Sequence, residues 1–313
     1  MEFSIVTSIF NDGSLAQEFC QEVSSVVACY LNVSIPDLKN KLEIIFVNDG
    51  SRDNSLQDLL KVKETFETVK VVDLSRNFGQ HEALACGFRL AKGDLIIRLN
   101  VDLQDPPNEI PKLLEEIKTK NSDLVVGFYD QRNSPWLDCI TAKIYFQVFS
   151  FLSGIKIDKQ TSAMRVMSRR FIDAYNSLTE KSRFPQGLDH WLGFNHSYVP
   201  VIHRSRKMGK SSYNFLSRIS LAVTGILYFS DRPLKLIIYL GFCLAGLGTV
   251  LGLAIIAQKF FYNSIIPGYT SLAIIGLFGT GLQICCIGVI GIYLGKVFRE
   301  TQNRPLYVIS SIY

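Results

Sequence analysis

Short apolar runs alternate with helical patterns from residue 3 to residue 128 of the chain. Five such runs, rich in Val, Ile, Leu and Phe, are FSIVTSIF, EIIFVND, VKVVDLS, DLIIRLN and DLVVGF. Stretches with helical spacing lie between them, for example SLQDLLKVKETF and NEIPKLLEEIKTK. Continuous apolar strands that alternate with helices are typical of βαβ units. The pattern predicts an α/β domain with a mainly parallel sheet, whose ligands bind at the carboxyl ends of the strands.

Two much longer apolar stretches lie near the C-terminal end. No charged residue occurs from Leu236 to Ala257 or from Phe260 to Gly295. Because about 20 apolar residues in a helix cross the bilayer core, we expect one transmembrane helix at residues 234–257 and a second at residues 269–295. A Pro-Gly turn would join them. The alternative is a buried helical hairpin in a soluble protein.

Basic residues are distributed asymmetrically around these stretches. Seven lysines and arginines lie between residues 204 and 235, three follow the second stretch, and Lys259 lies between the two stretches. Since cytoplasmic segments are enriched in Lys and Arg, we expect a multi-pass protein of the inner (cytoplasmic) membrane with both termini in the cytoplasm.

The predicted organisation therefore has three further parts beside the two spans. Residues 1–213 form the cytosolic domain, and residues 296–313 form a cytosolic tail. Residues 214–233 form a linker whose central stretch, residues 215–230, is apolar but contains Arg218, which favours an amphipathic helix lying at the membrane interface. A helix packed on the α/β domain is the alternative for this segment.

Composition excludes several classes of protein. Hydrophobic residues make up 48% of the chain, charged residues 19%, and mean hydropathy is +0.19, whereas disorder requires low hydrophobicity and high net charge. The seven cysteines include no C-x-x-C pair, which indicates reduced thiols in a protein that faces the cytosol. The formal net charge of +5 is mild, and we expect no nucleic-acid partner.

Polar side chains follow four of the predicted strands. They include Ser8 and Asp12 after the first strand and Asp49 after the second. The third is followed by SRNFG and the fourth by NVDLQDPP. In an open parallel sheet these ends meet at one crevice, and carboxylate and amide oxygens suit a divalent cation that also holds substrate phosphates. No Walker A or G-x-G-x-x-G motif is present, so the residues indicate a metal-assisted site for a nucleotide or nucleotide sugar.

Five segments taken together resemble the inverting glycosyltransferases of family 2. They are SIVTSIFND, EIIFVNDGSRDNS, LSRNFGQHEALACGF, AKGDLIIRLNVDLQDPP and IGVIGIYLGKVFRETQNRPLYVI. More narrowly, they look like the polyprenyl-phosphate glycosyltransferases, which include bactoprenol glucosyltransferases and relatives of dolichyl-phosphate mannose synthase. The resemblance covers nearly the whole chain. It implies a GT-A (Rossmann-like, mixed but mainly parallel) cytosolic domain with a C-terminal two-helix transmembrane anchor, and transfer of a sugar, with inversion, from a UDP or GDP donor to a polyisoprenyl phosphate.

The resemblance also implies roles for individual residues on the donor side. Those that match its nucleotide-binding motifs, together with their neighbours, are Ser8, Phe10, Asp12, Asp49, Ser51, Arg76 and Gln80. Asp102 and Gln104 match the motif that binds a metal and the diphosphate. We therefore expect Mg²⁺ or Mn²⁺ as cofactor, with Asp102 and Gln104 as its ligands.

Basic side chains are the candidates for binding the lipid phosphate. That phosphate is mostly dianionic at pH 7, so it needs positioning and charge neutralisation more than a general base. The predicted catalytic residues are Asp102, Arg132, Arg165 and Arg206, and the predicted acceptor-phosphate residues are Arg204, Lys210 and Ser211.

Two positions depart from the family pattern. Asn100 occupies the place of the first acid of the D-x-D motif, and Ala163 occupies the place of an Asp that is sometimes given a catalytic role. We expect displacement by the lipid phosphate without a protein base, with Asp189 as an alternative acid or base. Asp102 could instead cap the following helix, although Asp105, directly before a proline, suits that role better.

The predicted function is transfer of a hexose from a UDP-sugar to polyprenyl (undecaprenyl) phosphate at the cytoplasmic face of the membrane. Glycines in the apolar stretches also permit a homo-oligomer. Two alternatives remain open: a glycosyltransferase that acts on another lipid acceptor, and a catalytically inactive paralogue that serves as a membrane scaffold. Strand-end motifs do not specify which sugar is transferred.

Overall fold

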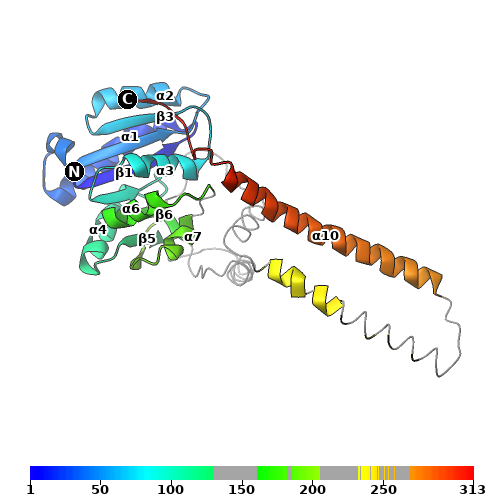
Figure 1. The fold of residues 1–313 in the computed structure, drawn as a ribbon. Coiled ribbons are helices and arrows are strands. Elements are labelled where there is room, and N and C mark those ends of the chain that lie inside the picture. Colours follow the sequence, from blue (N-terminus) through cyan, green and yellow to red (C-terminus); the bar gives the residue numbers. More distant parts are fainter. Residues whose placement is uncertain are drawn as a thin grey trace. The chain divides into compact units, whose positions relative to one another are not determined.

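The computed structural model describes residues 1–129, 161–181, 185–204 and 268–313, with scattered positions between 232 and 257 (Figure 1). The described residues fall into two units. One is an α/β unit that contains the residues up to 204 and also Arg304–Tyr313. The other is helical and contains the described residues from 232 to 303.

The α/β unit is built on one eight-stranded sheet with the order β7-β5-β6-β4-β1-β2-β3-β8. The strands are β1 (Phe3–Ile9), β2 (Leu42–Asn48), β3 (Val69–Leu74), β4 (Leu95–Arg98), β5 (Leu124–Phe128), β6 (Thr161–Ser168), β7 (His196–Pro200) and β8 (Ile309–Ile312). Strands β1 to β4 are mutually parallel, and β5 is parallel to β7. The strand β6 is antiparallel to β4 and β5, and β8 is antiparallel to β3. The predicted mixed, mainly parallel sheet is therefore confirmed, and the five predicted strands are β1 to β5.

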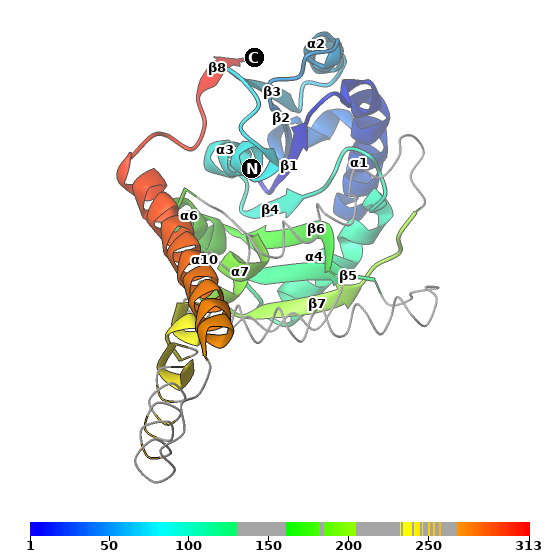
Figure 2. The ribbon, with the colours of Figure 1, turned by 90° about the vertical axis from the view of Figure 1, so that its right-hand side faces the viewer.

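Helices cover both faces of this sheet. The helices of the unit are α1 (Ala16–Leu31), α2 (Ser55–Thr65), α3 (Gln80–Leu90), α4 (Ile110–Thr119), α6 (Arg169–Ser177) and α7 (Pro185–Trp191). Figure 2 shows α1 and α4 on one face and α3 and α6 on the other. Every residue of β2 is buried, as expected for a strand covered on both sides. A Cβ at Gly87 on α3 would lie 2.3 Å from Cγ1 of Val6, so glycine allows the close approach of α3 to β1.

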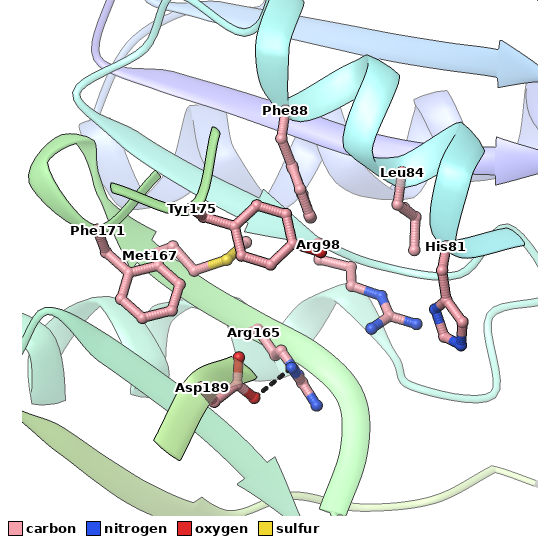
Figure 3. Close-up of a pocket in the computed structure, with 9 residues that line it drawn as sticks. All are labelled: His81, Leu84, Phe88, Arg98, Arg165, Met167, Phe171, Tyr175 and Asp189. Atoms are coloured by element: carbon pink, nitrogen blue, oxygen red, sulfur yellow. Dashed lines mark hydrogen bonds and ion pairs between the residues drawn. The ribbon is translucent and has the colours of Figure 1, made fainter. Parts of the chain in front are cut away.

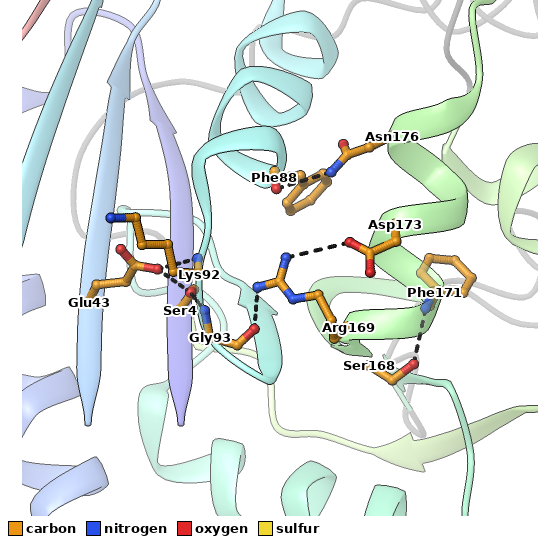
Figure 4. A network of polar contacts seen from close by, with 10 residues as sticks. All are labelled: Ser4, Glu43, Phe88, Lys92, Gly93, Ser168, Arg169, Phe171, Asp173 and Asn176. Carbon is orange, nitrogen blue, oxygen red and sulfur yellow. Dashed lines mark hydrogen bonds and ion pairs between the residues drawn. The ribbon is translucent and has the colours of Figure 1, made fainter. Parts of the chain in front are cut away.

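A buried acid ties together the amino ends of three strands (Figure 4). The Glu43 carboxylate on β2 accepts hydrogen bonds from the Ser4 hydroxyl and the Lys92 backbone N–H, each at 2.5 Å. The Ser4 hydroxyl oxygen accepts from the Gly93 N–H at 2.7 Å, and Arg169 donates to the Gly93 carbonyl. These bonds set the loop before β4 against β1, and they thereby fix the position of β4 in the sheet.

The C-terminal residues return to the α/β unit. The strand β8 extends the sheet next to β3, with Val72 opposite Ile312, and the Ser75 N–H donates to the Val308 carbonyl at 3.0 Å. Residues 304–313, expected in a cytosolic tail, thus form part of the sheet unit.

The helical unit contains α10 (Tyr269–Thr301), which begins where the second span was predicted and continues to Thr301. Its segment Gly279–Thr301 is long and apolar enough to cross a membrane, and its most apolar stretch is not buried inside the protein. Within the part of the chain that the structure describes, the helix Leu234–Leu244 is apolar but shorter. Ten of the 24 residues of the predicted first span, and all of the interfacial segment 214–233 except Arg232, lie outside the described residues. The two-helix anchor therefore stays a prediction.

We expect Glu43→Ala to lower the free energy of unfolding by roughly 1–3 kcal/mol, because the Ser4 hydroxyl and the Lys92 N–H would lose their buried acceptor. Denaturant unfolding of the detergent-solubilised protein measures this. The control is Glu67→Ala, which removes a largely exposed carboxylate paired with Lys39 and is expected to change stability by about 0.5 kcal/mol or less. Equal effects of the two variants would contradict the structural role of Glu43.

Candidate active site

The carboxyl ends of β1, β2, β3 and β4 lie side by side, and the loops that follow them carry most of the predicted donor-side residues. Parallel pairing brings Ser8 opposite Val47 and Asn48 opposite Asp73. The structure therefore brings together the strand ends at which the sequence predicts a ligand site.

Asp49 is the buried acid that joins the loop after β2 to the start of α3. Its carboxylate is 2% exposed and accepts hydrogen bonds from the Phe78 N–H at 2.8 Å and the Gly79 N–H at 3.0 Å. Burial raises the pKa of Asp49, while the two N–H donors and Arg76 act in the opposite direction. The next residue, Gly50, has φ +63°, and a Cβ there would lie 2.3 Å from the Arg76 carbonyl carbon. The two loops are therefore packed backbone to backbone.

Asn48 links the first three strand ends through its side-chain amide. It donates to the Asp73 carboxylate at 2.6 Å, and its oxygen accepts from the Ser51 hydroxyl at 2.6 Å. The Ser51 oxygen in turn accepts from the Asn11 N–H at 3.0 Å, and the Asn11 side chain accepts from the Arg52 N–H at 3.1 Å. Asn48 thus holds Ser51 in place at the ends of β1 and β2 and acts as a positioning residue.

Other predicted nucleotide residues offer accessible groups near these strand ends. Phe10 is 46% exposed, and Asp12 beside it is exposed. The Arg76 guanidinium lies 4.2 Å from the centre of the Phe78 ring and is also exposed. An aromatic face, a carboxylate and a guanidinium on this surface can stack on a base and bind sugar hydroxyls or phosphate.

The loop after β4 carries the predicted metal ligands. The Asp102 carboxylate is half-buried and accepts from the Gln104 N–H at 3.3 Å, across Leu103 with φ +55°. The Asn100 side-chain oxygen accepts from the Gln80 amide at 3.4 Å, which ties this loop to the first turn of α3.

This donor set suits a cation that a substrate helps to bind. Among the described residues, no group of three or more His, Cys, Asp or Glu side chains is arranged to hold a metal. Mg²⁺ commonly uses only one or two protein carboxylates together with waters and substrate phosphates. Asp102, with the amide oxygens near it, fits that pattern and does not form a closed protein cage.

Asp105 has a different role from the one expected. It does not cap the following helix, because the 3-10 turn Pro107–Glu109 has Pro106 at its N-cap and no side-chain cap. Its carboxylate, 2% exposed, accepts from the Tyr129 hydroxyl at 2.7 Å and the Ala163 N–H at 3.2 Å. Burial and the Asp105 charge raise the pKa of Tyr129. Asp105 therefore holds the loop after β4 against β5 and β6.

The predicted acceptor-side residues are found in two separate places. The Arg204 N–H donates to the Gln104 carbonyl at 2.8 Å, and its guanidinium lies 3.4 Å from the Glu22 carboxylate. Arg165, by contrast, is buried on β6, where it pairs with Asp189 of α7 at 2.5 Å. Asp189, the alternative acid or base, is thus the ion-pair partner of Arg165. Arg132, Arg206, Lys210 and Ser211 lie outside the described residues.

Comparison of the sequence with known proteins identifies a family that matches this chain. Residues 4–175 match the sequence model of Glycosyl transferase family 2. An uncharacterized glycosyltransferase of Synechocystis sp. is 34% identical over 100% of this chain and 96% of its own length. A prophage bactoprenol glucosyl transferase homolog of Escherichia coli is 31% identical, with 100% and 99% covered. The bactoprenol glucosyl transferase of Shigella phage SfII is 32% identical, with 99% and 97% covered.

Solved structures agree on the fold. Glucosyl-3-phosphoglycerate synthase from Mycobacterium tuberculosis, solved with Mn²⁺, uridine-diphosphate-glucose and phosphoglyceric acid, superposes with a TM-score of 0.50 at 17% identity. The superposition covers 72% of this chain and 77% of that one. Together with the family match, it confirms the predicted GT-A fold of the α/β unit.

We expect the stability of the protein to fall as the pH drops from about 6.5 to about 4, in part through His81. Burial, followed by Arg98 and Arg165, lowers the pKa of His81 from 6.5 to about 4. In this window the unfolded chain binds a proton at His81 that the folded protein does not, so protonation favours unfolding. In the variant His81→Gln, the free energy of unfolding should therefore fall by about 1–3 kcal/mol less than in the wild type over this pH range.

Urea unfolding of the wild type and of His81→Gln, across this pH range, measures the effect. His203→Gln is the control, because its ring packs on Tyr129 with centroids 4.6 Å apart and outside the His81 environment. Parallel stability curves for wild type and His81→Gln would contradict the prediction.

Proposed function

The chain belongs to glycosyl transferase family 2, and on that basis we propose that it transfers a sugar from a nucleotide sugar to a polyprenyl phosphate at a membrane surface. The observation that carries the proposal is the similarity to bactoprenol glucosyl transferases, at 31–32% identity over 99–100% of this chain. That similarity includes the C-terminal part of the chain, where α10 provides a helix apolar enough to enter a bilayer. The acceptor named for those relatives is a lipid that a membrane would supply.

For the donor we propose a UDP-hexose bound at the carboxyl ends of β1 to β4. Phe10, Asp12 and Arg76 would contact the base, ribose or diphosphate from their accessible positions. Asp49, Ser51 and Gln80 would shape the crevice, since their side chains are bonded within or between its loops. Ser8 would line its floor at the end of β1.

For the metal we propose Mg²⁺ or Mn²⁺ shared between Asp102, Gln104 and the donor diphosphate. A divalent cation bound there supplies charge stabilisation to the leaving nucleoside diphosphate. Support comes from the half-buried Asp102 carboxylate and from the Mn²⁺ and uridine-diphosphate-glucose held by the solved structure with the same fold.

For the acceptor we propose direct attack of the lipid phosphate oxygen on the anomeric carbon. The C–O bond to the diphosphate breaks as the new bond forms on the opposite face, so the configuration inverts. A phosphate monoester that is already mostly dianionic at neutral pH has no proton for a base to remove. Ala163, which carries no acid, is consistent with this scheme. Arg204, bonded to the Asp102 loop through its backbone, would bind the phosphate together with Arg132, Arg206, Lys210 and Ser211.

We further propose that residues 234–257 and 269–295 both span the inner membrane, with residues 214–233 at its cytoplasmic interface. The basic residues on both flanks of the apolar stretches support cytoplasmic termini. This arrangement would hold the active site next to the leaflet from which the lipid phosphate is taken.

We expect Asp102→Asn to lower the rate of sugar transfer by about 10²- to 10³-fold, because it removes charge stabilisation from the departing diphosphate. The assay incubates membranes containing the protein with radiolabelled UDP- and GDP-sugars and counts label in lipid extractable by organic solvent. Glu64→Gln, the same acid-to-amide change at an exposed position on α2, should keep the wild-type rate.

The labelled lipid from this assay also distinguishes the alternative functions. Label released by mild acid indicates a glycosyl monophosphate lipid, whereas acid-stable label indicates another lipid acceptor. No transfer from any sugar, combined with no binding of UDP and Mn²⁺ by calorimetry, would favour the inactive scaffold.

We expect Ala163→Asp to leave the transfer rate unchanged or lower. A carboxylate at this position would lie close to Asp105, whose oxygen already accepts from the Ala163 N–H, and like charges would repel. The measurement compares the rate and its pH dependence in the two proteins. Rescue of an inactive wild type by the introduced acid would refute attack without a protein base.

A further inference from the structure

A small pocket with several unpaired nitrogen atoms lies between α3, β4, β6, α6 and α7 (Figure 3). His81 comes from the first turn of α3, Arg98 from the end of β4, Arg165 from β6 and Asp189 from α7. Apolar side chains, among them Phe88 and Phe171, close the rest of it. Nothing in the proposed transfer reaction uses this pocket.

Two arginines meet in this pocket as direct cross-strand neighbours. Arg98 and Arg165 are opposite each other in the antiparallel register of β4 and β6, and they are 8% and 5% exposed. Like charges directly opposite each other on a sheet destabilise it, and burial increases the cost.

The carboxylates near this pair do not fully neutralise it. Asp189 is bonded to Arg165 at 2.5 Å. Asp105 acts on Arg98 more weakly than Asp189 does, and both of its oxygens are bonded to Tyr129 and Ala163. His81 is neutral at physiological pH, because its pKa is lowered to about 4. One positive charge of the arginine pair is therefore left without a bonded carboxylate among the described residues.

Nitrogen atoms of all three basic side chains also lack partners. Nε of Arg98, Nε of Arg165 and Nδ1 of His81 are buried and make no hydrogen bond within the described part of the chain. Buried polar atoms left unpaired are rare in native proteins and costly. The pocket has room for the centre of about one water-sized particle. A water molecule would satisfy the nitrogen atoms but not the excess charge, whereas one small anion would meet both requirements.

We propose that the pocket binds one monatomic anion, chloride in the cell, between Arg98, Arg165 and His81. The anion would neutralise the arginine pair and accept hydrogen bonds from the two unpaired Nε–H groups. Since Arg98 ends β4 and lies only a few residues before Asp102, the anion would also stabilise the strand end that carries the proposed metal ligand. Binding of the anion does not depend on the proposed transfer reaction.

The first test is the thermal unfolding of the full-length protein in detergent, in sodium chloride and in sodium gluconate at equal ionic strength. We expect the unfolding midpoint to rise with chloride to a plateau about 2–4 °C above the gluconate value. Arg98→Met keeps the length of the side chain and removes its charge, so it should abolish the rise. The control Arg89→Met removes an exposed arginine from α3, and the rise of the unfolding midpoint with chloride should persist in this variant.

A direct measurement of binding accompanies this test. Line broadening of the ³⁵Cl NMR signal by the wild type should be reversed by bromide, and it should be absent with Arg98→Met. Should Arg98→Met fail to fold, His81→Phe, which places a larger apolar ring in the pocket, takes its place in both experiments.

Several results would overturn the proposal. Equal midpoints of the wild type in chloride and gluconate, or a chloride rise that persists in both pocket variants, would mean that the pocket holds water only. Displacement of chloride by UDP would mean that the anion belongs to the nucleotide site.

Discussion

The two hydrogen bonds from the Phe78 and Gly79 backbone to the Asp49 carboxylate determine the arrangement of the donor side of this molecule. They join the end of β2 to the start of α3, two segments that would otherwise be separate surface loops. Burial raises the pKa of Asp49, and these donors and the nearby Arg76 favour its charged form. The adjacent Gly50 has no Cβ, so the loop after β2 can approach the backbone of Arg76 closely enough for these hydrogen bonds to form. This joint positions Arg76, Phe78 and Gln80, and the Arg76–Phe78 stacking and the Gln80–Asn100 hydrogen bond add to it.

The same principle extends across the remaining strand ends. Asn48 connects β2 to β3 and, through Ser51, to the loop after β1. Gln80 connects α3 to the loop after β4, and Asp105 connects that loop to β5 and β6. Short polar side chains thus bridge neighbouring loops, so that the crevice is preorganised before any ligand arrives. Preorganised polar groups stabilise developing charge without the cost of reorientation during reaction, which suits a reaction whose leaving group is a diphosphate.

Sequence patterns predicted those parts of the structure that depend on local composition. The strands β1 to β5 are continuous apolar runs, and the donor-side residues follow them directly. The strand β6 was not predicted, because its sequence TSAMRVMS contains an arginine and so does not look like a buried strand. This arginine, Arg165, is buried because it pairs with Asp189, which lies 24 positions away in the sequence. The strand β8 is a four-residue edge strand that joins β3 from the far end of the chain. Asp105 was expected to cap a helix because it precedes a proline, yet its partners Tyr129 and Ala163 are distant in sequence. Contacts between residues that are distant in the sequence leave no periodic pattern of hydrophobic positions from which they could be predicted.

The basic residues show why a count of charges cannot identify the groups that meet the acceptor. Arg165 and Arg204 were both predicted to act on the acceptor side from their type and position alone. Burial separates them: the Arg165 side chain is 6% exposed and bonded to Asp189, whereas the Arg204 side chain is 41% exposed beside the Asp102 loop. The buried Arg165 guanidinium is out of reach of a lipid phosphate at the protein surface, and moving it outward would leave Asp189 buried without its partner. Arg204 can exchange its contact with Glu22 for a phosphate at small cost, because a partly exposed ion pair contributes little to stability. In the proposed reaction, a binding site for the lipid phosphate therefore requires partly exposed cations such as Arg204.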